Sequence, residues 1–340
     1  VGMLEHVNIQ YDELEFFEGN SADTIIIGSN VVDVRSDLSS SLGIPSSDVP
    51  SDSHAESRHF NKVVIKESTV IKSSKNEILQ GEVDYYKSIP SELSALFPKL
   101  ISERAVDATE LSIEITRVNG IVGSHLIANR FLDEYKLNIV LDGLRMLHEY
   151  DCNGQVDDAR CYSNLGNKVC ARYTQYKDIY KALSDDVDDL YNQIIAKLQI
   201  YEEQRRGHMC SFIHGDPVLS NCIISDRKIS FIDMNGCQGD CLTTRGDCTY
   251  DLAKVLQSLY GYDYIILSVD IQEHDNLILA RLRQHFRRYV KLHYPKVALD
   301  DIQIICASLL FSLIPLHEKT THHDQFMKLC RTTLEDYFGE

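Results

Sequence analysis

The chain has 340 residues, of which 44% are hydrophobic, and this supplies enough apolar surface to bury the core of one large domain or of two smaller ones. Lys and Arg total 34 against 51 Asp and Glu, so the formal net charge of −17 opposes nonspecific binding to nucleic acid or to anionic lipid. The ten cysteines are scattered through a chain too long to need disulfide staples, which favours reduced thiols and a cytoplasmic location.

A membrane segment is not expected either. The sequence does not open with a basic segment followed by an apolar one, and the longest apolar stretch, 302–316, contains Gln303, Ser308 and Ser312. That stretch is too short to span a bilayer. We therefore expect neither export nor membrane insertion.

Residues 1–57 are expected to form an N-terminal extension that ends in a linker. The β-branched run 24–34 is broken by Gly28-Ser29-Asn30, which predicts one or two strands joined by a turn. Residues 36–57 are dense in Ser, Asp and Pro and poor in large apolar side chains, a composition typical of a loop or linker.

Residues 58–120 predict a small nucleotide-binding lobe. Short β-rich segments at 61–66 and 69–72 indicate a hairpin, and 77–87 has the apolar spacing of a helix. Polar and apolar residues alternate from 111 as in a half-buried strand, until Asn119-Gly120 breaks the pattern. Residue 120 is therefore our predicted lobe boundary.

Residues 121–340 predict a larger, mainly helical lobe. Helical spacing occurs at 137–148, and apolar positions at intervals of three and four predict one long amphipathic helix over 179–201. Short β-prone runs follow at 211–213, 222–224 and 229–232, and beyond residue 250 the patterns are helical.

The most informative stretch, 212–236, reads FIHGDPVLSNCIISDRKISFIDMNG. One predicted strand ends in His214-Gly215-Asp216, Asn221 follows in the loop, and a second strand ends at Asp233. Phosphoryl transfer needs a carboxylate that orients the attacking hydroxyl and oxygen ligands for magnesium, and these three side chains supply that set. The alternative is that Asp and Asn simply form turns at strand ends; His214 is expected to be a buried histidine that ties the loop together.

The pattern HGDxxxxN, followed by Ile232-Asp233, resembles the catalytic and metal motifs of the aminoglycoside phosphotransferase and choline kinase family. The resemblance covers roughly 61–326 and implies an α+β, two-lobed, protein-kinase-like fold with an antiparallel-sheet N-lobe and a mainly helical C-lobe. Two further segments, 246–254 and 72–90, resemble the branch found in bacterial capsule and surface-polysaccharide gene products.

The resemblance also implies roles for individual residues. Asp216 would be the catalytic base, Asn221 and Asp233 would bind Mg²⁺, and Asp251 would brace the catalytic loop. Backbone groups in the strand and linker near Ile115 to Val118 could hydrogen-bond the adenine edge of ATP.

Lys72 would contact the ATP phosphates, and Glu82 would be its partner on the following helix. An ion pair of this kind aims a strand lysine at phosphates. Lys66 competes for the role, and an ordinary surface ion pair is the alternative reading of Lys72 and Glu82. A glycine-rich G-x-G-x-x-G loop is missing before Lys72, which weakly disfavours a protein substrate.

Two metal alternatives are disfavoured. Cys237, Cys241 and Cys248 form no C-x-x-C pair with histidines at zinc-finger spacing, so free thiols are the better interpretation. His322-His323-Asp324 near the end is better explained as an exposed polar turn between helices.

The sequence therefore predicts an ATP- and Mg²⁺-dependent phosphotransferase that acts on a hydroxyl of a small molecule, namely a sugar, polyol or amino alcohol. Two alternatives stay open: a catalytically silent pseudokinase that binds a nucleotide or a protein, and the kinase-like domain of a longer enzyme. The sequence indicates no oligomeric state.

Overall fold

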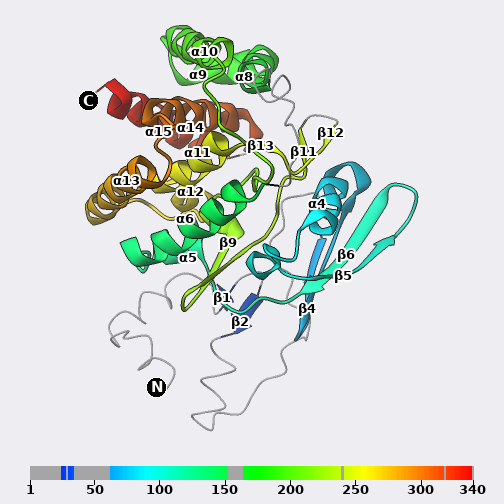
Figure 1. Ribbon diagram of the computed structural model, residues 1–340. Coiled ribbons are helices and arrows are strands. Elements are labelled where there is room, and N and C mark those ends of the chain that lie inside the picture. Colours follow the sequence, from blue (N-terminus) through cyan, green and yellow to red (C-terminus); the bar gives the residue numbers. More distant parts are fainter. Residues whose placement is uncertain are drawn as a thin grey trace.

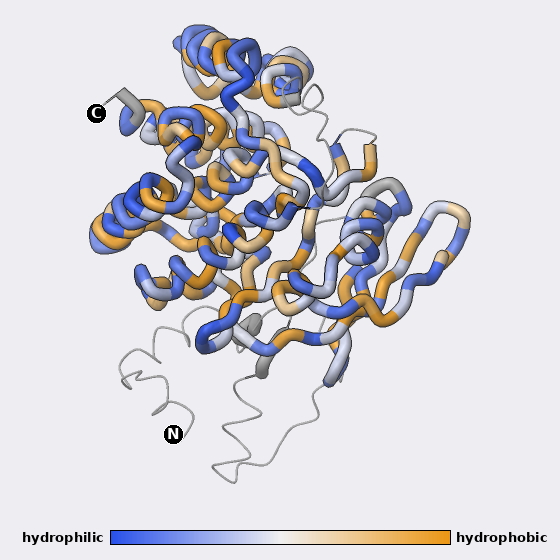
Figure 2. Tube along the Cα trace, viewed as in Figure 1, coloured by the Kyte–Doolittle hydropathy of each residue, from blue (hydrophilic) through white to orange (hydrophobic). Residues whose placement is uncertain are grey.

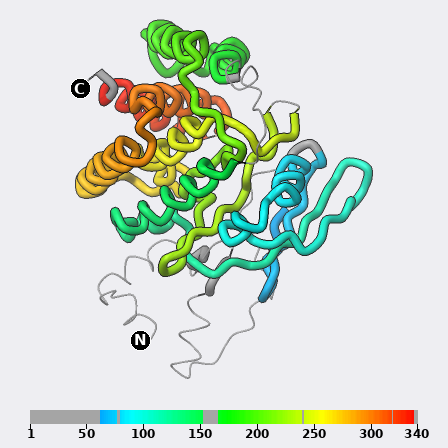
Figure 3. Tube along the Cα trace, in the orientation of Figure 1, coloured from blue at the N-terminus to red at the C-terminus, as the bar shows by residue number. Residues whose placement is uncertain are grey.

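The computed structural model describes residues 24–27, 30–33, 62–151, 164–238, 241–317 and 319–338 (Figure 1). The linker predicted at 36–57 and most of the N-terminal extension lie outside the described residues. A lobe built on a sheet and a larger helical lobe lie side by side, and the chain passes from the first to the second in sequence order (Figures 1 and 3).

The N-lobe is a four-stranded antiparallel sheet with one helix. Its strands run in the order β3-β4-β6-β5, and helix α4 packs against β4 and β6. The bounds are β3 Lys62–Ile65, β4 Thr69–Lys75, α4 Asn76–Ser88, β5 Leu100–Ala105 and β6 Glu110–Thr116. Buried Val70, Ile113 and Ile115 on the sheet and Leu79 and Val83 on the helix belong to the core, as the alternating and helical patterns predicted.

Strand β5 has no counterpart among the predicted elements. Its sequence, LISERA, does not alternate, and five of its six residues are exposed. It lies at the edge of the sheet, and its register against β6 shifts between Leu100 and Ser102. A bulged, solvent-facing edge strand buries too little apolar surface to leave a period-two signal.

Short strands organise the centre of the C-lobe. Strand β7 pairs with β9, which pairs with β10, and this small sheet receives the chain as it leaves the N-lobe. Two further antiparallel pairs are β8 with β13 and β11 with β12, and β1 pairs with β2, which gives the two strands expected on either side of 28–29. The bounds are β1 Thr24–Ile27, β2 Asn30–Asp33, β7 Ile121–Val122, β8 Met209–Cys210, β9 Cys222–Ser225, β10 Lys228–Phe231, β11 Cys237–Gln238, β12 Cys241–Leu242 and β13 Gly246–Asp247.

The strand predicted at 211–213 is wrong by position. The strand is β8, and the residues that follow it leave the ladder, with Ile213 donating its N–H to the Thr244 carbonyl at 2.9 Å. Ser211, Phe212 and Ile213 are buried because they run through the core toward the loop at 214–221. Burial without pairing gives the same sequence signal as a short strand.

Helices make up the rest of the C-lobe, and hydrophobic residues concentrate on their inward faces (Figure 2). Helix α14 is central and packs against α11, α15, α8 and α10. The bounds are α5 Gly123–Ala128, α6 Glu134–Glu149, α8 Asn164–Gln175, α9 Lys177–Leu183, α10 Val187–Glu203, α11 Cys248–Leu259, α12 Tyr262–Ile266, α13 Glu273–His293, α14 Leu299–Leu313 and α15 Thr320–Phe338, with 3-10 turns at Ser94–Leu96, Leu219–Asn221 and Ile314–Leu316.

The single helix predicted over 179–201 is two helices, α9 and α10. The chain is extended at Ser184, with φ −164° and ψ 138°, and α10 restarts after Asp186. Ser and Asp compete with helical hydrogen bonding, and acidic residues are stabilising in the first turn of a helix. Arg331 of α15 holds the break by pairing with Asp186 at 2.6 Å. The apolar spacing continues across the break because both helices face the same core.

One helical window, Leu299–Leu316, is long and apolar enough to cross a membrane by length and composition alone. This window is longer than the stretch considered in the sequence, so length does not decide the matter. However, 72% of it is buried inside the fold. Its apolar composition is accounted for by its place at the centre of the helical lobe.

Candidate active site

The catalytic loop, residues 214–221, lies between β8 and β9, and Asp251 of α11 holds its backbone through hydrogen bonds. The fully buried Asp251 accepts the backbone N–H of His214 at 2.7 Å and that of Gly215 at 2.8 Å. His148 of α6 holds the same carboxylate, with Nε2 3.0 Å from Oδ2. A buried carboxylate with several donors is well satisfied, so Asp251 fixes the backbone from which Asp216 projects.

His214 supports the loop from within. Its ring is completely buried, and Nδ1 accepts the backbone N–H of Asp216 at 3.1 Å. Burial lowers the pKa of the His214 imidazole, against the pull of the carboxylates of Asp251, Asp216 and Asp233. A neutral, enclosed ring agrees with the structural role expected for His214.

Asp216 and Asn221 lie at the two ends of this loop and contact each other. The Asn221 amide donates to the Asp216 backbone carbonyl at 2.9 Å, which leaves the Asn221 side-chain oxygen to accept. The Asp216 side chain is 34% exposed, and its Oδ1 lies 2.9 Å from the Nζ of Lys254. Asp216 therefore combines a fixed backbone with a carboxylate that solvent and ligands can reach.

Lys72, Glu82 and Asp233 meet where the two lobes face each other. Lys72 on β4 has its Nζ 2.5 Å from Glu82 Oε2 on α4 and 2.7 Å from Asp233 Oδ1, just after β10. The Lys72 side chain is only 12% exposed, so this is not an ordinary surface ion pair. Burial opposes the charge of Lys72, but Asp233 and Glu82 outweigh it and raise the pKa of Lys72. Lys66 instead pairs with Glu114 at 3.4 Å on the exposed side of the sheet.

The two residues proposed for adenine binding differ in their surroundings. Ile115 is buried near the C-terminal end of β6, where it pairs with Val70 of β4 on one side and Leu100 of β5 on the other, so its main chain belongs to the sheet. It can contribute an apolar wall but is badly placed to offer backbone hydrogen bonds. Val118 follows the end of β6 in the connection between the lobes, and its contact with adenine stays a prediction.

The oxygen donors expected for magnesium fit a hard cation. Asn221 retains an amide oxygen, and Asp233, 48% exposed, turns one carboxylate oxygen toward Lys72 and keeps the other. Oxygen ligands of this kind suit Mg²⁺, which keeps several waters and binds through few protein groups. Within the described ranges, no three His, Cys, Asp or Glu side chains gather as a metal-binding group.

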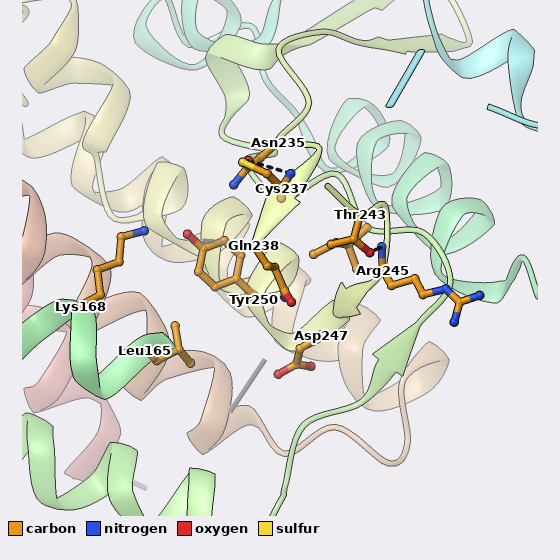
Figure 4. A pocket seen from close by; sticks show the side chains of 11 residues that line it. Leu165, Lys168, Asn235, Cys237, Gln238, Thr243, Arg245, Asp247 and Tyr250 are labelled. Atoms are coloured by element: carbon orange, nitrogen blue, oxygen red, sulfur yellow. Dashed lines mark hydrogen bonds between the residues drawn. The ribbon is translucent and has the colours of Figure 1, made fainter. Parts of the chain in front are cut away.

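A cavity opens beside the catalytic loop (Figure 4). Its walls come from helix α8, from the catalytic loop at Ile213 and Gly215, from the segment after Asp233, and from the start of α11. The other lining residues on these walls are Leu165, Lys168, Asn235, Cys237, Gln238, Thr243, Arg245, Asp247 and Tyr250. The cavity therefore lies within one residue of Asp216.

Comparisons with known proteins bear on this geometry. A thermostable mutant of aminoglycoside phosphotransferase APH(4)-Ia, in a ternary complex with AMP-PNP and hygromycin B, superposes on 91% of this chain and 100% of its own with a TM-score of 0.56 and 13% identity. Aminoglycoside phosphotransferase APH(3'')-Id from Streptomyces rimosus covers 84% of this chain and 98% of its own, with a TM-score of 0.50 and 18% identity.

The chain has the kinase-like fold of these phosphotransferases. The predicted α+β architecture, with its antiparallel-sheet N-lobe and helical C-lobe, is thereby confirmed. A third structure, an aminoglycoside-3'-phosphotransferase of type VIII, covers 77% of this chain and 94% of its own with a TM-score of 0.50 and 14% identity. No family model matches the sequence, and no curated protein does.

Sequence reasoning missed the role of Lys254 in this kinase-like fold. The residue was noted only as part of a family-like segment, although a lysine three positions after Asp251 lies on the same side of an α-helix. Once Asp251 is placed beneath the catalytic loop, that spacing brings Lys254 to Asp216. The signal was present, but it needed the docking of α11 to be interpreted.

Proposed function

We propose that this protein is an ATP- and Mg²⁺-dependent phosphotransferase that transfers the γ-phosphoryl group to a hydroxyl of a small molecule: a sugar, a polyol or an amino alcohol. The observation that carries the proposal is the contact of Lys72 with both Glu82 and Asp233, opposite a catalytic loop that presents Asp216. This joins a phosphate-binding cation, a metal-binding carboxylate and a base at the junction of the lobes.

In this proposal each residue of the chain has a defined task. Lys72 binds the phosphates of ATP and is aimed by Glu82. Asn221 and Asp233 hold Mg²⁺, which when bound neutralises charge that develops on the transferred group. Asp216 orients the acceptor hydroxyl and takes its proton while the new O–P bond forms, the bond between the γ-phosphorus and the bridging oxygen breaks, and ADP leaves.

We also propose that the protein belongs with the phosphotransferases of capsule and surface-polysaccharide synthesis and works in the cytoplasm. The segments 72–90 and 246–254 support the first point, and the pattern of scattered cysteines supports the second. In that setting a sugar or polyol fits better than an antibiotic.

The test is ATP consumption with Mg²⁺ across a panel of sugars, polyols, choline, ethanolamine and aminoglycosides. Wild type should turn over with particular acceptors, and Asp216→Asn should abolish turnover while it retains nucleotide binding. Asp226→Asn, in the β9–β10 turn, is the matched control and should behave as wild type. Mg-ATP binding without turnover on any acceptor would favour a nucleotide-binding pseudokinase, and failure to bind Mg-ATP would refute the kinase proposal.

A further inference from the structure

The cavity beside the catalytic loop is connected to the Asp216 carboxylate through the side chains of Tyr250 and Lys254. Tyr250 lines the cavity, and its ring faces the Nζ of Lys254 at 5.8 Å from the centroid. Lys254 in turn contacts Asp216. Only two side chains, Tyr250 and Lys254, therefore separate a molecule in the cavity from the group proposed to handle the acceptor hydroxyl, and the cavity is well placed to hold the acceptor.

The charges around this cavity have the opposite sign to those of the whole chain. The protein carries a formal net charge of −17, yet among the described residues the cavity is lined by Lys168 and Arg245 against a single acidic residue, Asp247. Asp247 is also occupied: it accepts the backbone N–H groups of His208 and Thr249, each at 2.9 Å, and the hydroxyl of Tyr201. Its charge caps helix α11 and is not available to balance a lysine.

Lys168 supplies the positive charge that faces the cavity. Figure 4 shows its ammonium pointing toward the hydroxyl of Tyr250, so two donors converge from opposite walls. Among the residues that the structure describes, no carboxylate lies within ion-pair distance of Lys168. Burial raises the pKa of the Cys237 thiol on another wall, and Lys168 acts on it in the opposite direction, so its field extends across the cavity.

Arg245 contributes differently. Its backbone N–H donates to the Thr243 hydroxyl at 3.0 Å, and its guanidinium is directed away from Lys168 (Figure 4). Arg245 therefore adds to the positive potential at the rim, whereas direct contact with a ligand in the cavity falls to Lys168 and Tyr250.

We propose that the phosphate acceptor carries an anionic group, a phosphate or a carboxylate, and that Lys168 and Tyr250 bind this group in the cavity. The inference rests on the proposed function and narrows it, from hydroxyl compounds in general to sugar phosphates or sugar acids. An ammonium with a neighbouring hydroxyl donor binds such anions through charge-assisted hydrogen bonds. The same ammonium repels amino alcohols and polyamine antibiotics.

The first experiment compares acceptors matched in everything but charge: a neutral sugar, its phosphate, its uronic acid and its amino sugar. The sugar phosphate or the uronic acid should have the highest kcat/KM. The preferred one of the two shows whether the anionic group of the acceptor is a phosphate or a carboxylate. Lys168→Met should raise KM for the anionic acceptor by roughly tenfold or more, with kcat nearly unchanged, and Lys168→Arg should restore most of the loss. Lys181→Met, on α9 outside the cavity, is the control lysine.

The second experiment does not depend on turnover. Binding of the sugar phosphate and of the uronic acid is measured by calorimetry without ATP, in wild type, Lys168→Met and Lys72→Met. The inference requires that Lys168→Met weaken this binding roughly tenfold and that Lys72→Met leave it intact. Loss of binding in Lys72→Met alone would put the anion in the nucleotide site and overturn the inference. A preference for neutral or amine-bearing acceptors, insensitive to Lys168→Met, would overturn it while leaving the kinase proposal standing.

Discussion

The Nζ of Lys254 lies 2.9 Å from Oδ1 of Asp216, and the lysine side chain is only 12% exposed. Burial opposes the charge of this lysine, but attraction to Asp216 outweighs it and raises the pKa of Lys254. The ammonium therefore stays charged beside the proposed base at any physiological pH. The loop itself carries no cationic side chain between Asp216 and Asn221, because the residues there are Pro217, Val218, Leu219 and Ser220. Helix α11 supplies one.

Lys254→Met should therefore lower kcat by roughly a hundredfold or more, because it removes a fixed positive charge beside the reacting groups. The dissociation constant for Mg-ATP should change little, since Lys72 binds the phosphates in our proposal. Lys254→Arg should retain part of the activity. The measurement is kcat together with nucleotide affinity by calorimetry. If Lys254 acts only through Asp216, the double variant with Asp216→Asn should be no slower than Asp216→Asn alone. If instead the kcat of Lys254→Met alone stays within about threefold of wild type, Lys254 has a packing role only.

Lys72→Met should destabilise the fold in a manner that depends on pH. Burial raises the pKa of Glu82, and Lys72 opposes that rise, so removing the lysine raises the Glu82 pKa further. A carboxyl with a raised folded-state pKa contributes stability below its unfolded-state pKa, and this stability is lost as pH rises through the folded-state value. The variant should thus lose more stability relative to wild type at pH 8 than at pH 5. Denaturant unfolding at both pH values checks this.

The matched control for that prediction is Lys66→Met, because Lys66 pairs with Glu114 in an exposed position on the same sheet. An exposed pair contributes about 0–1 kcal/mol. A destabilisation of Lys72→Met that is as small as that of Lys66→Met, and independent of pH, would show that the contacts of Lys72 with Glu82 and Asp233 add no more to stability than a surface pair.

The sequence predicted the fold best where one pattern has one physical cause. The alternation in β6 and the helical spacing of α4 reflect faces that pack on each other, so the patterns and the elements coincide. The sequence pointed to Asp216, Asn221 and Asp233 because a loop and a hairpin of fixed length can return them to one region, and their roles stay predictions. In the structure, the Ile232 N–H next to Asp233 donates to the Asn221 carbonyl at 3.1 Å. Contacts between distant segments could not be interpreted before the helices were placed, as Lys254 with Asp216 and Lys168 facing the cavity demonstrate.

Gly215→Ala should disable the catalytic loop. Gly215 has φ +81°, and a Cβ there would lie 2.8 Å from the Cβ of Asn235, so the substitution combines backbone strain with a clash. The loop must then move relative to Asp251, and Asp216 moves with it. We expect a loss of about 1–3 kcal/mol in stability and a larger loss in kcat. Gly166→Ala in helix α8 is the control: the nearest atom to its Cβ belongs to the flexible Glu202 carboxylate at 3.3 Å, and activity should persist. Equal activity losses in the two variants would argue against a specific role for the loop conformation.

Asp263→Asn should stabilise the protein at neutral and alkaline pH. Asp263 in α12 is completely buried, and burial raises its pKa from 3.8 to about 7, although the neighbouring Ser258 and Ser220 act in the opposite direction. Because the folded-state pKa is the higher one, its protonation favours the fold below about pH 4, and that contribution is lost progressively as pH rises toward 7. An asparagine is neutral throughout, so the variant should lack this part of the pH dependence and gain a few kcal/mol over wild type at pH 8.

The free energy of unfolding between pH 4 and pH 8 tests this, with Asp226→Asn in the exposed β9–β10 turn as the control. A variant that is less stable than wild type at pH 8 would mean that the ionised carboxylate is paired well enough to outweigh its burial.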